Sequence, residues 1–214
     1  CVATDVAQLS LTINGEVVAT AEANELKYDY TVPAEGDYTF TFTATKGEET
    51  KIVSEQTCVV SAPVQQVRPK SVDMGIYYHS PAAGESLGSV TLSTYAASKT
   101  EPAKHVFVVG DFNNWAISNK YQMKQDGNYF WLEIDGLETK KEYAFQYVVV
   151  RADGITKKIS DLYSEKVLHP DDQYEPKTVN PDLMDYPKGG EGYVSVLQID
   201  KPEFEWSEAT LNFK

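Results

Sequence analysis

The chain has 214 residues, 42% of them apolar and 12% aromatic, a composition typical of a globular protein with one or two domains. Its formal net charge is −13, from 19 basic and 32 acidic residues. A surface this acidic repels phosphate backbones and anionic lipid headgroups, so nucleic acid and membrane surfaces are excluded as expected partners. No stretch approaches the roughly 20 consecutive apolar residues of a membrane-spanning helix, and no signal peptide is recognisable.

The two cysteines, Cys1 and Cys58, are too few for a disulfide framework or for a zinc site of paired CxxC motifs. Three interpretations of Cys1 stay open. It is a lipid-anchored first residue, one half of a bridge to Cys58, or a boundary at which a longer sequence was cut. The residues after it read like the interior of a strand, which favours the boundary.

Residues 1–62 show the period-two alternation of strands. Residues 8–13 alternate polar and apolar side chains and run into Asn14-Gly15, a strong hairpin signal. The same alternation predicts further strands over residues 25–32, 38–45 and 50–60. Short strands at this spacing, without helical periodicity between them, are typical of a β-sandwich.

Residues 63–72 contain two prolines and no periodicity, so we expect a linker there. A second β-sandwich is expected from residue 73 to residue 200. Its strands are predicted at residues 75–78, 89–96, 105–109, 129–134, 142–150 and 193–199. Residues 161–190 are rich in Pro, Asp and Tyr and predict a long loop, which is uncommon unless it is functional or packs on a neighbour.

The run VVGDFNNW at residues 108–115 resembles the strand and turn of family-48 carbohydrate-binding modules, found before the catalytic domains of the α-amylase family, glycoside hydrolase family 13. Further segments follow in the family's order, at residues 121–137, 142–150, 161–172 and 193–206. The resemblance implies an all-β chain with two immunoglobulin-like (E-set type) β-sandwiches in tandem and no catalytic barrel. Residues 201–214 would then be an exit segment toward such a barrel.

The resemblance also implies a candidate carbohydrate-binding site at Trp115, with Asn114, Tyr121 and Gln146. An exposed flat ring can stack on the apolar face of a pyranose while polar groups at its rim bind the hydroxyls. The sequence departs from the binding pattern elsewhere. Ile155 and Thr156 stand where the family has a second tryptophan, and Gln146 stands where it has a lysine. We therefore expect Trp115 to be packed by the protein itself, with α-glucan binding as the alternative.

Two further sets of aromatic residues are candidate contacts for a catalytic barrel. Tyr129 and Trp131 share one face of a predicted strand, opposite the apolar face of Phe130 and Leu132. They form an outward strip or belong to a core that uses both faces of the sheet. The other set lies in the exit segment and comprises Phe204, Trp206 and Phe213.

No catalytic constellation is recognisable. Acidic pairs occur by chance among 32 carboxylates, and no nucleophile, phosphate-binding or zinc-protease motif is present. The three histidines, His79, His105 and His169, have no ligand-like spacing. The acidic residues between 161 and 185 lack the spaced pattern of a Ca²⁺ loop. We expect no catalytic residues, metal or cofactor in this chain.

The leading hypothesis is a non-catalytic accessory region of an enzyme that degrades starch or glycogen, bracing or positioning the catalytic barrel of the same polypeptide. One alternative is an autonomous starch-binding protein of the cell surface, and another is a structural stalk or adhesion module. Because such enzymes act on polysaccharides outside the cytoplasm, an extracytoplasmic location is expected, whether secreted, periplasmic or attached to the outer surface.

Overall fold

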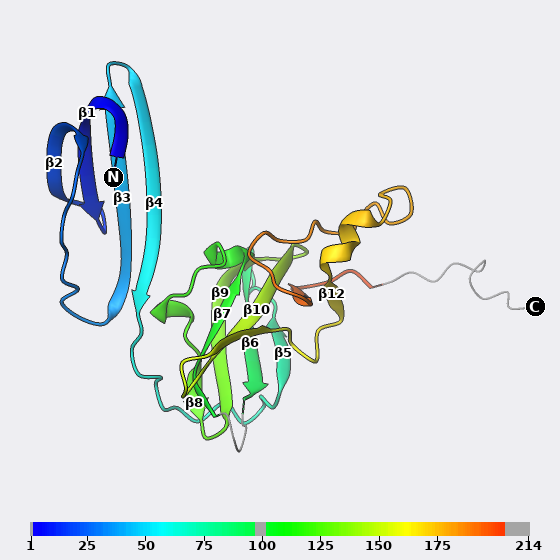
Figure 1. Ribbon diagram of the computed structural model, residues 1–214. Coiled ribbons are helices and arrows are strands. Elements are labelled where there is room, and N and C mark those ends of the chain that lie inside the picture. The colour runs from blue at the N-terminus through cyan, green and yellow to red at the C-terminus, as the bar shows by residue number, and fades with distance from the viewer. Residues whose placement is uncertain (1, 97–101, 204–214) are drawn as a thin grey trace, which may run out of the picture. The chain divides into compact units, whose positions relative to one another are not determined.

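The computed structural model describes residues 2–96 and 102–203, with side chains from residue 7 onward (Figure 1). Strands and three short 3-10 turns are the regular elements of these ranges, which confirms the predicted all-β class. Within the same ranges there is no helix with the length and apolar character needed to cross a membrane. The chain divides into two compact units. Residues 1–62 and 116–122 form the first, and residues 63–115 and 123–214 form the second.

The first unit is built on a four-stranded antiparallel sheet of order β2-β1-β3-β4. Its strands are β1 (Val2–Ile13), β2 (Glu16–Glu25), β3 (Gly36–Lys46) and β4 (Glu49–Val59). Asn14 and Gly15 connect β1 to β2 with φ angles of 51° and 85°. Positive φ at both central residues is the requirement of a type I′ hairpin turn, so the predicted turn is confirmed.

The predicted strand over residues 25–32 is wrong, because β2 ends at Glu25 and the next strand begins at Gly36. β2 pairs with one edge of β1 and β3 with the other, so the chain between them must cross a face of the sheet. On the crossing, Leu26 is buried and the Tyr30 ring lies 6.2 Å from that of Tyr38. Of the alternating apolar residues, Leu26 and Tyr30 pack on the sheet, whereas Tyr28 and Val32 are exposed.

The second layer of the first unit is this crossing over residues 26–35, packed on the apolar face of the sheet. Leu9, Leu11 and Ile13 supply the buried face of β1. The unit also takes in residues 116–122 from later in the chain. There the Asn119 side chain accepts a hydrogen bond from Ser61 N and donates one to Val59 O, both at 3.1 Å.

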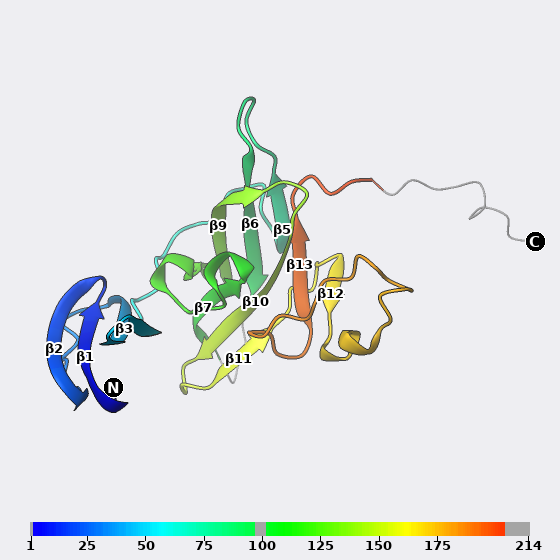
Figure 2. The same cartoon turned by 90° about the horizontal axis from the view of Figure 1, so that it is seen from above.

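The second unit contains two antiparallel sheets. The first has the order β5-β6-β9-β8. Its strands are β5 (Gly75–His79), β6 (Leu87–Tyr95), β8 (Lys124–Asp126) and β9 (Tyr129–Glu138). The second has the order β11-β10-β13-β12, and β7 pairs with the other edge of β10. Its strands are β7 (Ala103–Gly110), β10 (Glu142–Arg151), β11 (Thr156–Ile159), β12 (Lys166–Leu168) and β13 (Val194–Gln198). Figures 1 and 2 show these sheets as two layers.

The core between the two sheets follows from the register of their strands. In the first sheet Leu92 lies opposite Leu132, and both are buried. In the second sheet the fully buried Tyr147 lies opposite Val108. Period-two alternation thus gives each sheet one apolar face to bury against the other. This sandwich agrees with the immunoglobulin-like fold that the sequence predicted.

Residues 63–72, predicted as a linker, extend the first sheet of the second unit. Gln65 forms an isolated parallel bridge with Gln125, next to β8. Gln66 N donates to Gln125 O at 2.9 Å, and Gln125 N donates to Val64 O at 2.8 Å. The segment therefore covers an edge that β8 would otherwise leave open.

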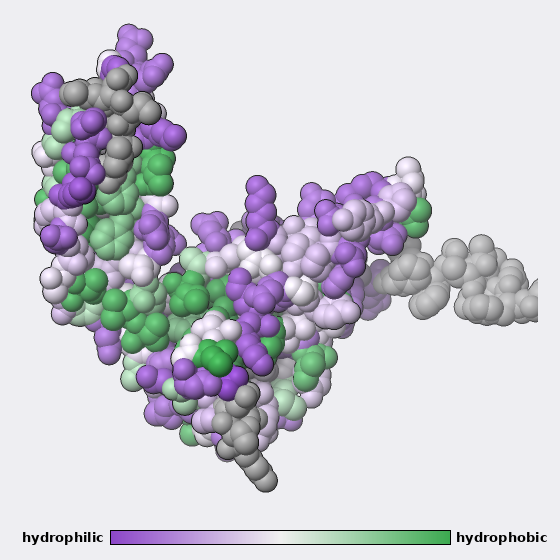
Figure 3. Space-filling model, in the orientation of Figure 1, coloured by the Kyte–Doolittle hydropathy of each residue, from purple (hydrophilic) through white to green (hydrophobic). Residues whose placement is uncertain are grey.

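The predicted loop after residue 160 contains β12 and the short 3-10 turn η3 (Pro170–Tyr174). Residues 169–192 are here called the covering segment, and its later part packs on the outer face of the second sheet. Leu183, Met184 and Tyr186 of this segment pack against a buried cluster that includes Ala144 and Val194. In the space-filling view, hydrophilic side chains gather around η3 (Figure 3). The outer face of the sheet is thus an apolar layer under a polar surface.

Candidate functional site

The GDFNNW run forms a tight turn after β7 that holds Trp115 in place. Gly110 ends the strand where a Cβ would lie 2.5 Å from Ala144 O, so only glycine fits without a shift. Asn113 closes the turn by accepting from Gly110 N and donating to Val108 O, both at 2.9 Å. Asp111 accepts from Trp115 Nε1 at 3.0 Å and from Ala144 N at 2.8 Å. The indole is therefore fixed by the turn that precedes it.

The covering segment packs on the Trp115 ring. Trp115 is half-buried and contacts the cluster that includes Ala144, Val194 and Tyr186. A Cβ added to Gly189 would lie 2.3 Å from Trp115 Cγ, so the backbone of Gly189 rests directly on the indole. The Gly189 carbonyl also accepts from Lys158 Nζ at 2.8 Å. The segment therefore covers part of the indole, around Cβ, Cγ and Cδ2.

Gln146 is fully buried and its amide is used within the fold. Its Nε2 donates to Glu191 O at 2.6 Å and to Tyr193 O at 2.8 Å, and its Oε1 accepts from Glu191 N at 3.0 Å. Both amide hydrogens thus clamp the end of the covering segment to β10. In this arrangement Gln146 is a structural group with no hydrogen left to offer a sugar.

The four predicted carbohydrate contacts are divided between the two units. Trp115 and Gln146 both contact the covering segment, as described above. Asn114 is exposed beside Trp115, with a positive φ of 53°. Tyr121 belongs to the first unit with residues 116–122. The sugar-binding roles of these residues stay predictions.

Of the predicted barrel contacts, Trp131 is on the outer face of the first sheet but only 4% exposed. Its Nε1 donates to Gln66 O at 2.9 Å, so residues 63–72 cover the ring. Tyr129 lies under the Arg68 guanidinium, 3.5 Å from the ring centroid, and its ring is 5.0 Å from that of Tyr95. The chain's own residues thus occupy the predicted outward strip. Phe204, Trp206 and Phe213 lie outside the described residues.

Asp161 is the most notable buried carboxyl group, at 5% exposed. Burial raises its pKa, and the hydrogen bonds that it accepts from Tyr147 Oη and Tyr163 N lower it in part. Its own N–H donates to Ser195 Oγ at 2.7 Å. These bonds hold the turn at residues 161–164 onto the second sheet, so the role of Asp161 is structural.

The histidines occupy separate places. His79 Nε2 lies 2.9 Å from Thr91 Oγ1, and the His169 side chain accepts from Asp171 N at 3.3 Å at the start of η3. His105 is buried in β7, and burial lowers its pKa. Within residues 2–96 and 102–203, no group of three or more His, Cys, Asp or Glu side chains is arranged to hold a metal ion.

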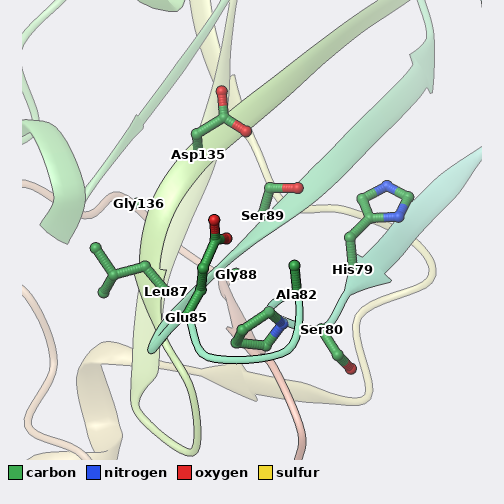
Figure 4. A pocket seen from close by; sticks show the side chains of 10 residues that line it. His79, Ser80, Ala82, Glu85, Leu87, Gly88, Ser89, Asp135 and Gly136 are labelled. Atoms are coloured by element: carbon green, nitrogen blue, oxygen red, sulfur yellow. The ribbon is translucent and has the colours of Figure 1, made fainter.

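Sequence reasoning did not predict the cavities of the second unit. One, of about 320 Å³, lies beside the turn from β5 to β6. Figure 4 shows Asp135, Ser89 and Glu85 reaching into it from β9, β6 and that turn, with His79 at one side. Its lining is polar and open to solvent. No sequence signal marks it, since its residues come from two separate stretches of the chain, 79–89 and 135–136.

Residues 75–164 match the family described as carbohydrate-binding module 48 (isoamylase N-terminal domain). The match begins with β5 and ends just after the turn that Asp161 holds. Residues 1–62 and the covering segment lie outside it, whereas residues 116–122 of the first unit lie within it. A comparison with curated proteins finds no match to the chain.

Proposed function

We propose that this chain is the non-catalytic accessory region of an enzyme that degrades an α-glucan, and that its second unit braces or positions the catalytic domain. The carbohydrate-binding module 48 domain at residues 75–164 carries this proposal, because such domains are typical N-terminal modules of α-glucan-active enzymes of glycoside hydrolase family 13. The partner would be the catalytic domain of the same polypeptide. The location would be outside the cytoplasm, where such polysaccharides are degraded.

The covered outer face supports bracing over glucan capture at Trp115. Gly189 lies on the indole, and Gln146 uses both amide hydrogens to hold Glu191 and Tyr193. Opening this face for a sugar would strip apolar surface from the covering segment and leave buried polar groups unpaired, each at a cost of about 1–3 kcal/mol. The face is therefore built as a stable surface of the domain.

The test is to compare the natural enzyme that carries this region with a form that lacks residues 63–203. We expect the shortened enzyme to melt at a lower temperature and to lose kcat/KM on maltoheptaose, because its catalytic domain has lost a packed neighbour. Isolated residues 1–214, assayed for reducing ends released from starch, control for activity of the region itself. Unchanged melting and kinetics in the shortened enzyme would contradict the proposal.

A further inference from the structure

A second cavity, of about 410 Å³, lies where β13 ends and the chain leaves the sandwich. β12 pairs with β13 only from Leu168 to Lys166, which lies opposite Val196. Gln198 is therefore beyond the paired part of this edge and lines the cavity. Figure 2 shows the end of β13 next to β5, which contributes Tyr78 to the lining.

Fixed hydrogen-bonding groups of both kinds line this cavity. Lys166 Nζ lies 2.8 Å from each carboxylate oxygen of Glu142, and Lys201 Nζ lies 3.0 Å from Glu165 Oε2. These ion pairs place two acceptors and two donors at the rim. The Lys166–Glu142 pair is partly buried and is therefore the better preorganised of the two, which lowers the entropy lost when a ligand binds.

The charge balance of the lining favours a neutral ligand rich in hydroxyl groups. The acidic residues Glu142, Glu165, Asp200 and Glu203 outnumber the ammonium groups of the two lysines, so an anion is repelled. The lysines neutralise two of the carboxylates, which weakens the attraction for a cation. Sugar hydroxyls can donate to carboxylates and accept from ammonium groups, so they use both kinds of group.

Tyr78 provides an aromatic surface in the same cavity. Tyr78 is 42% exposed and lines the cavity together with Gln198. Burial raises the pKa of Tyr78, so the phenol stays protonated at neutral pH. A partly exposed ring beside polar groups is the arrangement that packs against the apolar face of a pyranose.

We infer that this cavity is a sugar-binding site, with Tyr78 as the stacking ring and the carboxylates and lysines around it as partners for the hydroxyls. The class of sugar, a short α-linked glucose oligomer, rests on the proposed function. The cavity is formed partly by residues 200–203, at the end of the described chain. The covered Trp115 has no part in this site.

The test is calorimetric titration of the 214-residue chain with maltoheptaose at millimolar concentrations. We expect heat of binding in the parent chain and at least about fivefold weaker binding in Tyr78→Ala, which removes the ring. The matched control is Tyr28→Ala, because Tyr28 is 47% exposed and belongs to the first unit. It should bind as the parent does. Glu165→Gln, which keeps the ring but alters an exposed rim carboxylate, should also weaken binding.

Equal heats in the parent, Tyr78→Ala and Glu165→Gln would overturn the inference. So would binding that is lost in Trp115→Phe but kept in Tyr78→Ala, since the sugar would then use the covered face. No heat in the parent would likewise overturn it, while the bracing role would still be judged by the enzyme that lacks residues 63–203. The two proposals can therefore fail separately.

Discussion

Single buried polar groups decide how the second unit is held together. Asp161 is the clearest case, because its carboxylate lies under the turn at residues 161–164 and accepts from Tyr147 Oη at 2.6 Å and from Tyr163 N at 2.7 Å. Burial disfavours its charged form, while these two bonds favour it, and the net effect is a raised pKa. The group therefore stabilises the fold most when it is protonated.

The raised pKa of Asp161 predicts how stability depends on pH. The contribution of Asp161 is fully present below the ordinary pKa of 3.8 and is lost as pH rises through the raised folded value. The free energy of unfolding of the parent should thus fall, relative to that of Asp161→Asn, as pH rises above about 4. Urea titrations followed by tryptophan fluorescence measure this in the second unit, which contains Trp115 and Trp131.

Asp182→Asn serves as the control for this experiment, since Asp182 is exposed on the covering segment. It shows the general effect of removing one acidic residue from a chain of net charge −13. If the difference between the parent and Asp161→Asn stays constant with pH, burial does not shift the titration of Asp161.

At the scale of elements, local sequence patterns predicted the features that depend on residues close together in the chain. The Asn14-Gly15 hairpin and the alternation along β3 were predictable, because a turn type and a buried face leave period-two signals. The crossing at residues 26–35 was not, since alternation of apolar and polar residues does not report hydrogen-bond partners. The sequence predicted the turn that carries Trp115, but it did not predict that the covering segment packs on the indole. Gly189 is far away in the chain and has no local signal for that contact.

The covering segment gives the prediction that belongs to this scale. Gly189→Ala would place a Cβ 2.3 Å from Trp115 Cγ and must push the segment or the indole aside. We expect the second unit to lose about 1–3 kcal/mol of stability, as overpacked sites do, and Trp115 to become more accessible to acrylamide quenching. The control is Asp182→Ala, because Asp182 is an exposed residue of the same segment. Equal stability and quenching in the two variants would contradict the close packing on Trp115.

At the scale of the whole molecule, the sequence suggests a simpler division into domains than the structure shows. The linear pattern suggests consecutive domains, whereas the first unit combines residues 1–62 with residues 116–122. Residues 116–122, here called the returning segment, have no apolar periodicity that would assign them to either unit. Its link to the first unit depends on hydrogen bonds between residues far apart in the chain, which sequence patterns do not report.

The returning segment predicts that residues 1–62 alone are less stable than the first unit within the chain. Asn119 joins the ends of β3 and β4, because its N–H donates to Asp37 Oδ1 at 2.9 Å while its side chain bonds Ser61 N and Val59 O. Asn119→Ala removes the side-chain bonds and leaves their partners unpaired, which should cost about 1–3 kcal/mol.

Hydrogen exchange of the β3 and β4 amides, followed by NMR, measures that loss. Residues 1–62 alone and the Asn119→Ala chain should both exchange faster than the parent. Asn128→Ala serves as the matched control, since Asn128 is an exposed asparagine of the second unit. If residues 1–62 alone are protected as strongly as in the full chain, the first unit folds without residues 116–122. Residues 116–122 would then lie against a sheet that is already complete without them, and residues 1–62 would form a domain of their own.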